Sequence, residues 1–156
     1  MNIPQKQSGS SLIEVMVALF VLGVGLLGIL VTQVKSVKLN QNSYLYSQAS
    51  VLVNDIYESM RYHSNPNDLT YYLMSYDDNY TASKDCSTSN CNEQELAKWQ
   101  RQEWMQNVST LLPSGQGEIS YDGGTELYTI SIRFQNGTDP DTGNPIWDTV
   151  SVKAGF

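Results

Sequence analysis

The apolar stretch GSSLIEVMVALFVLGVGLLGILV, from Gly9 to Val31, constrains this chain of 156 residues more than any other part of it. A short polar leader that contains Lys6 precedes the stretch, and one acid, Glu14, stands near its start. Residues 15–31 carry no charge, and as a helix they would extend about 26 Å at about 1.5 Å per residue. That length is close to the roughly 30 Å hydrocarbon thickness of a bilayer, so the segment can lie in a membrane.

Two ordinary interpretations of this stretch are a cleaved secretory signal and a plain membrane anchor. A secretory signal has an apolar core of about 7–15 residues and then a small-residue cleavage site, whereas this core is longer and is followed by TQVKSVKLNQ. A plain anchor leaves Glu14 unexplained, because an acid inside a membrane helix costs up to about 2.5–3.5 kcal/mol and indicates a functional position. Glu14 therefore favours a third interpretation.

The sequence GSSLIE, from Gly9 to Glu14, closely resembles the class III signal of type IV prepilins. The resemblance implies that a prepilin peptidase cleaves between Gly9 and Ser10 and methylates the new N-terminal amine of Ser10, where related chains usually have Phe or Met. It also implies that Glu14 pairs with the N-terminal amine of a neighbouring subunit during filament assembly. A carboxylate in the first helical turn is also stabilised by the helix dipole, by about 0.3–1 kcal/mol.

The rest of the chain is long enough for one small domain. We predict a leader over residues 1–9, a transmembrane or filament-core half of a long helix over 10–36, and a globular domain over 37–156. Charged residues make up 16% of the chain and the net charge is −7, which disfavours nucleic-acid binding, since that depends on Lys and Arg.

The sequence contains no phosphate loop, zinc-protease motif or nucleophile elbow, and His63 is its only histidine, at a place where we expect it to face solvent. We therefore predict no enzymatic activity and no cofactor.

Cys86 and Cys91 are predicted to form a disulfide, because the domain should lie outside the cytoplasm, where such bonds persist. Free thiols are the alternative, and a zinc site is disfavoured because structural zinc takes four nitrogen or sulfur ligands. Asp139 and Asp141 have the spacing of a calcium loop but lack its closing Glu, and they lie among ordinary turn formers. We therefore predict no metal site.

Apolar residues recur every three or four positions beyond the apolar stretch and predict one continuous helix over about residues 11–62. These residues are Val34, Val37, Leu45, Ala49, Leu52, Val53, Ile56 and Met60. A polar, tyrosine-rich loop with short local structure should follow over residues 64–85.

A second helix should begin near Asn92, which forms a capping-box pattern with Glu95, and should end before Pro113. Its apolar stripe is predicted to face a sheet, with Trp99 covering the long helix instead; the stripe consists of Ala97, Trp104, Val108 and Leu111.

Three alternating segments around Ile119, Ile130 and Val150 predict an antiparallel meander. Together these elements predict an α+β fold, and the resemblance implies the lollipop plan of type IV pilins, with the long helix packed on a small antiparallel sheet.

The run from Trp99 through LLPSGQGEI also resembles minor pilins of the PilV type. The resemblance implies a minor pilin that takes part in type IV pilus assembly or initiation, in twitching motility and in adhesion. It implies an inner-membrane, single-pass subunit with a periplasmic domain that later enters the pilus. The implied partners are the prepilin peptidase, other minor pilins, the major pilin and the inner-membrane assembly platform. A minor pseudopilin of type II secretion and a membrane-tethered adhesin domain are the alternatives.

Overall fold

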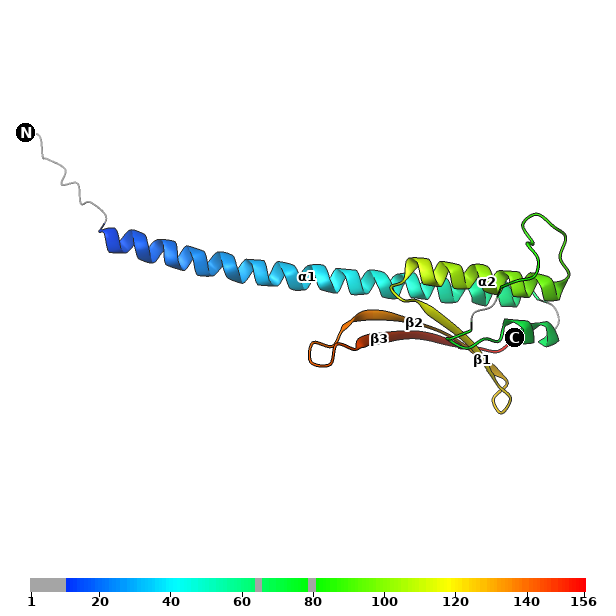
Figure 1. Cartoon of the computed structure of the whole chain (residues 1–156). Coiled ribbons are helices and arrows are strands. Elements are labelled where there is room, and N and C mark those ends of the chain that lie inside the picture. The colour runs from blue at the N-terminus through cyan, green and yellow to red at the C-terminus, as the bar shows by residue number, and fades with distance from the viewer. Residues whose placement is uncertain (1–10, 64–65, 79–80) are drawn as a thin grey trace, which may run out of the picture. The chain divides into compact units, whose positions relative to one another are not determined.

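A computed structural model describes residues 11–63, 66–78 and 81–156. The elements in chain order are α1 (Leu12–Arg61), the short 3-10 helix η1 (Pro66–Tyr72), α2 (Glu93–Leu111), β1 (Gln116–Asp122), β2 (Leu127–Thr138) and β3 (Pro145–Ala154) (Figure 1). This architecture confirms the predicted α+β class and the predicted long helix. The chain divides into two compact units, Met1–Gln41 and Asn42–Phe156, each described here by itself. The predicted leader, residues 1–9, lies outside the described residues.

The second unit is built on the last turns of α1. Its buried residues on this helix follow the predicted spacing of three and four: Ala49, Leu52, Val53, Ile56 and Met60. Figure 1 shows α2 beside these turns of α1, with both helices on one face of the sheet. The amphipathic stripe of α1 therefore supplies one wall of the hydrophobic core.

The sheet is the predicted antiparallel meander, with strand order β1-β2-β3. Ile119 pairs with Ile130, and Ile132 pairs with Val150. The central strand, β2, supplies four buried side chains at alternate positions, Tyr128, Ile130, Ile132 and Phe134. Its two neighbours are less buried, because they form the edges of the sheet; Tyr121, Ile146 and Val152 remain 46%, 47% and 43% exposed.

The predicted capping box begins α2. The side chain of Asn92 accepts a hydrogen bond from the backbone N–H of Glu95, and the carboxylate of Glu95 accepts one from the N–H of Asn92. At the other end, Leu112 has extended backbone angles, φ −120° and ψ 136°, because a residue before proline avoids the helical region.

The prediction of the apolar stripe on α2 is wrong for one residue. Leu111 is 47% exposed, and Leu112 is buried in its place, because the chain leaves the helix at Leu112 and directs that side chain into the core. The stripe also contains a residue that the sequence did not suggest: the side chain of Arg101 is buried, and its Nη1 donates to the backbone oxygen of Leu73 at 2.8 Å.

Trp104 joins α2 to both of its neighbours. Its indole Nε1 donates to the backbone oxygen of Leu52 on α1 at 2.8 Å, and its ring lies against the backbone of Gly117 on β1. The stripe therefore contacts α1 as well as the sheet. Trp99 is half-buried and lines a shallow cavity with Asp55 and Ile56 of α1, beside the long helix as predicted.

Replacing Gly117 with Ala should destabilise the domain by about 1–3 kcal/mol, the usual cost of overpacking a core. A Cβ at this position would overlap atoms Cη2 and Cζ3 of Trp104. The measurement is urea unfolding of the full chain in detergent micelles, followed by tryptophan fluorescence.

The matched control is Gly123→Ala in the β1–β2 turn, where the nearest atom to the new Cβ is Cε1 of Tyr121 at 3.9 Å. That change should leave the stability equal to wild type or slightly higher, because Ala restricts the unfolded chain. Equal stabilities for the two variants would show that Trp104 does not restrict position 117.

Candidate functional site

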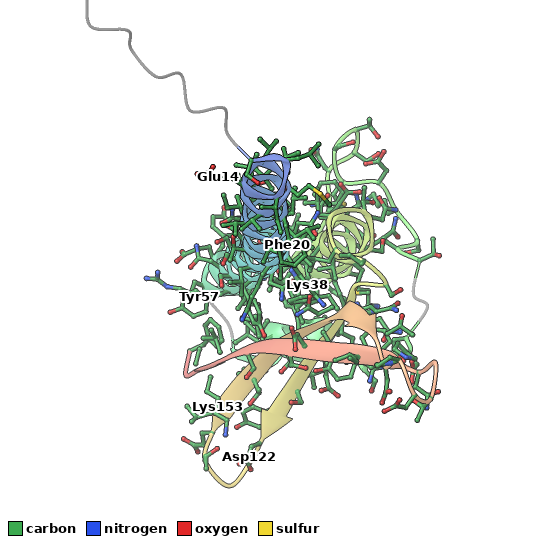
Figure 2. The ribbon with its side chains drawn as sticks, turned by 90° about the vertical axis from the view of Figure 1, so that its left-hand side faces the viewer. Glu14, Phe20, Lys38, Tyr57, Asp122 and Lys153 are labelled. Atoms are coloured by element: carbon green, nitrogen blue, oxygen red, sulfur yellow. A yellow bond between two sulfur atoms is a disulfide. The ribbon has the colours of Figure 1, made fainter. Side chains whose placement is uncertain are left out.

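The first turn of α1 positions Glu14, the residue for which the sequence predicts an assembly role. Glu14 lies in the first turn of the helix, and its backbone N–H donates to the oxygen of Ser11 at 2.9 Å. Figure 2, a view nearly along α1, labels Glu14 and Phe20 on this part of the helix. The next charged residue along the chain is Lys35. Gly9 and Ser10, the predicted cleavage site, lie outside the described residues.

The first half of α1 exposes apolar side chains on every side. Within its own unit, each large apolar residue from Leu12 to Val34 is at least 50% exposed. A helix that is apolar all round is stable only where lipid or other apolar helices surround it. The helix is also long and apolar enough to cross a membrane.

A shallow apolar groove runs along one side of this half. It is lined by Ala18, Val21, Leu22, Gly25, Leu26 and Ile29. A Cβ at Gly25 would meet no atom within 4 Å, so a side chain of another helix has room to enter there. Small residues permit such close approach between membrane helices.

The second predicted feature, the disulfide between Cys86 and Cys91, is present, with 5.6 Å between the two Cα atoms. It closes a short loop directly before the capping box of α2. Lys84 fixes this loop to the helix, because its Nζ donates to the backbone oxygen of Asn90 and lies 3.0 Å from Oε2 of Glu95. The loop thereby forms one hydrogen-bonded structure with the start of α2.

The hydrogen bond from the Asn92 N–H, assisted by the nearby Lys84 ammonium, lowers the pKa of Glu95 below its usual 4.5. Folding therefore favours the ionised form of this carboxylate, and the stability that it contributes depends on pH.

The residues considered for metal binding have turn-forming roles. The carboxylate of Asp139 accepts hydrogen bonds from the backbone N–H groups of Asp141 and Thr142 at 2.9 and 3.3 Å, and these bonds lower the pKa of Asp139. In the part of the chain that the structure describes, no group of three or more His, Cys, Asp or Glu could hold a metal ion.

The expectation that His63 faces solvent is wrong. Its Nε2 lies 2.9 Å from the hydroxyl of Tyr72, which also donates to Oε1 of Gln100. Burial raises the pKa of Tyr72 far above its usual value, so the hydroxyl stays neutral. These contacts join the end of α1, η1 and α2. No local pattern in the sequence predicts them, because the three residues lie on different elements.

The comparisons with known proteins give matches to two parts of the chain, one of which contains the apolar segment and Glu14. Residues 31–101 match the family model described as type IV pilin Tt1218, and residues 4–30 match the prokaryotic N-terminal methylation motif. No curated protein and no solved structure matches the chain.

The two family matches support a type IV pilin family and a pilin subunit role for the chain. A pilin is a structural subunit, so the likeness implies a structural role, together with interactions with other pilins and with the pilus assembly machinery in general. The methylation motif and the apolar helix suggest a membrane-anchored pilin that later enters the pilus.

Replacing Glu95 with Gln should reduce stability at neutral pH and have less effect in acid. Gln keeps the capping hydrogen bonds but loses the charge. Because the pKa of Glu95 is lower in the folded state, its contribution is present above the unfolded pKa, about 4.5, and is lost as pH falls through the folded value. Urea unfolding of wild type and variant from pH 7 to pH 3 measures the difference. A difference that stays constant with pH would contradict this, and adding Lys84→Met to both proteins should reduce it.

A chain that begins at Val37 should be a soluble, folded monomer with an intact Cys86–Cys91 bond. The deletion removes the apolar side chains of residues 12–34, which are exposed within their own unit. Size exclusion with light scattering and thiol labelling of unreduced protein measure both properties. Aggregation would mean that the domain needs its anchor or a partner, and two labelled thiols would contradict the bond.

Proposed function

We propose that this chain is a minor pilin of the PilV type that takes part in type IV pilus assembly or initiation, and through it in twitching motility and adhesion. The observation that carries the proposal is Glu14, a single acid in the first turn of an otherwise uncharged, exposed apolar helix. The methylation-motif match over residues 4–30 and the pilin match over residues 31–101 support the same conclusion.

In this proposal the prepilin peptidase removes residues 1–9 by cleavage between Gly9 and Ser10 and methylates the amine of Ser10. Residues 10–36 then form the membrane and filament-core half of the helix, and residues 37–156 form the globular pilin domain. The domain lies in the periplasm, which fits the Cys86–Cys91 bond, since such bonds persist in oxidising compartments.

The mechanism is helix bundling guided by one charge pair. Before assembly the subunit lies in the inner membrane as a single-pass protein. Packing of its apolar helix against other apolar helices then extracts it into the pilus or its initiating tip. Glu14 would be costly in lipid by itself, but a cationic N-terminal amine of a neighbour lowers that cost. Pairing also selects one axial position of the two helices, because packing between apolar helices alone is similar at many positions.

The proposed partners follow from these steps. They are the prepilin peptidase, the inner-membrane assembly platform, other minor pilins and the major pilin. The chain supplies no catalytic group and needs no cofactor in this role.

Replacing Glu14 with Ala or Gln tests pairing against simple anchoring. If Glu14 pairs with a neighbour's amine, either change leaves a buried amine without its partner, a loss that reaches about 3–5 kcal/mol. Membrane abundance and a mature N-terminus at Ser10 should remain as in wild type, while pilus yield and the variant's presence in sheared pili fall sharply. The measurement is immunoblotting of membranes and sheared pili, with N-terminal sequencing, in cells that lack the native copy.

Glu103→Gln is the matched control, because it removes the same charge from an exposed position on α2 and should leave pilus yield unchanged. Wild-type yields with Glu14→Ala would end the pairing mechanism and favour a tethered domain whose helix only holds it in the membrane. A mature chain that retains Lys6 would end the prepilin interpretation itself.

A further inference from the structure

The two edges of the sheet differ in how the chain covers them. The edge formed by β1 is covered at Ile119, whose backbone N–H and oxygen exchange hydrogen bonds with Met74 at 2.9 and 3.0 Å. The opposite edge is β3. Across residues 11–63, 66–78 and 81–156, no segment pairs with β3 on its outer side.

The strand register shows which backbone groups of β3 point outward. Because Ile119 bonds to Met74 on one side, its partner Ile130 has its backbone groups directed away from β1 and toward β3. The N–H of Gln135 points to the oxygen of Pro113, on the β1 side, as this alternation requires.

It follows that Val150 and Val152, which pair with Ile132 and Ile130, use their backbone groups in the sheet. Backbone groups alternate in direction along a strand, so the N–H and C=O groups of every second residue of β3 point away from β2, toward the outer side of the sheet. They belong to Trp147, Thr149, Ser151 and Lys153.

The side chains along this edge suit an added strand. Val152 is 43% exposed and Trp147 is 39% exposed, and Val150 is half-buried. The four residues from Thr149 to Val152 carry no charge, and Val and Thr favour strands. Natural edges are protected by charge or proline, and in β3 the proline and charges are Pro145, Asp148 and Lys153, which leave the run from Thr149 to Val152 unprotected.

Lys153 gives the edge a charge preference. Asp122 lies near Lys153 (Figure 2), but both oxygens of the Asp122 carboxylate accept hydrogen bonds within its own turn, from Gly124 and Thr125. An acid on an added strand, directly opposite Lys153, would therefore form a favourable cross-strand pair.

We propose that the outer edge of β3 binds an extended segment of another protein by antiparallel strand addition. This segment carries Val and Thr residues opposite Thr149 to Val152 and an acid opposite Lys153. Backbone hydrogen bonds to the four outward residues supply affinity, and the alternating side chains supply specificity. The inference is independent of the assembly role proposed for Glu14.

A second copy of this chain fits the edge less well. Outward residues must face outward residues, so every antiparallel register of two copies places Asp148 opposite an even-numbered residue of the other copy and Lys153 opposite an odd-numbered one. Asp148 and Lys153 lie on opposite faces of β3, so no such register brings them opposite each other. The net charge of −7 on each chain also opposes self-association.

The test uses the full chain in detergent micelles and a dye-labelled peptide, Glu-Val-Thr-Val-Thr-Lys-Tyr, whose first residue would lie opposite Lys153. Fluorescence anisotropy measures binding, and hydrogen exchange of the isotope-labelled chain locates it. We expect new protection at Trp147, Thr149, Ser151 and Lys153, while Val150 and Val152 are already protected without peptide. Absence of binding, or protection elsewhere, would overturn the proposal.

One pair of variants and one charge reversal sharpen the test. Ser151→Pro removes an outward N–H that an edge strand does not need for folding, and it should weaken peptide binding by about tenfold or more, whereas Ser151→Ala should not. Lys153→Glu should weaken binding of this peptide and improve binding of a peptide that begins with Lys. Equal binding by Ser151→Pro and Ser151→Ala, or the same protection in a dimer without peptide, would overturn the proposed occupant.

Discussion

The domain depends on the contact that Trp104 makes with two elements at once. Its indole N–H donates to the backbone oxygen of Leu52, in the last turns of α1, and its ring occupies the space that a side chain at position 117 would need. The first contact fixes where α2 lies along α1, and the second brings β1 close to α2. A smaller residue at 104 would leave a cavity, and any larger residue at 117 would separate the sheet from the helix.

The described part of the first unit, residues 11–41, has the opposite requirement, because all of these residues are exposed. From Leu12 to Val34 the helix exposes apolar side chains on all sides, so its stability must come from lipid or from other helices rather than from this chain. Among these apolar side chains, Glu14 is the charged one, and a cationic partner at one particular place would stabilise it. The chain thus combines a domain with its own hydrophobic core and an apolar helical segment that is stable only where lipid or other apolar helices surround it.

The sequence predicts what local patterns determine. The helix over residues 11–62, the capping box of Asn92 and Glu95 and the three alternating strands all follow from short-range periodicity. Leu112 is buried instead of Leu111 because the backbone is extended just before Pro113, which the apolar spacing alone does not predict. The bridge between Met74 and Ile119 joins distant segments and is seen only in the folded chain. The sequence was enough to name Gly9, Ser10 and Glu14 as candidate site residues. Their proposed roles involve a peptidase and a neighbouring subunit, and such roles depend on a short linear motif rather than on the folded domain.

Partner choice is the remaining physical problem. Apolar helices pack against many others, and a Glu14 pair would set their axial position without distinguishing one similar subunit from another. Discrimination has to come from outside the apolar half, where side chains differ between proteins. The edge of β3 that we propose as a binding site has suitable properties, because its outward backbone groups can pair with an added strand while Lys153 favours a strand that carries an acid opposite it. Because Asp148 and Lys153 lie on opposite faces of β3, two copies of this edge cannot set these two charges opposite each other, whereas another strand can carry an acid opposite Lys153.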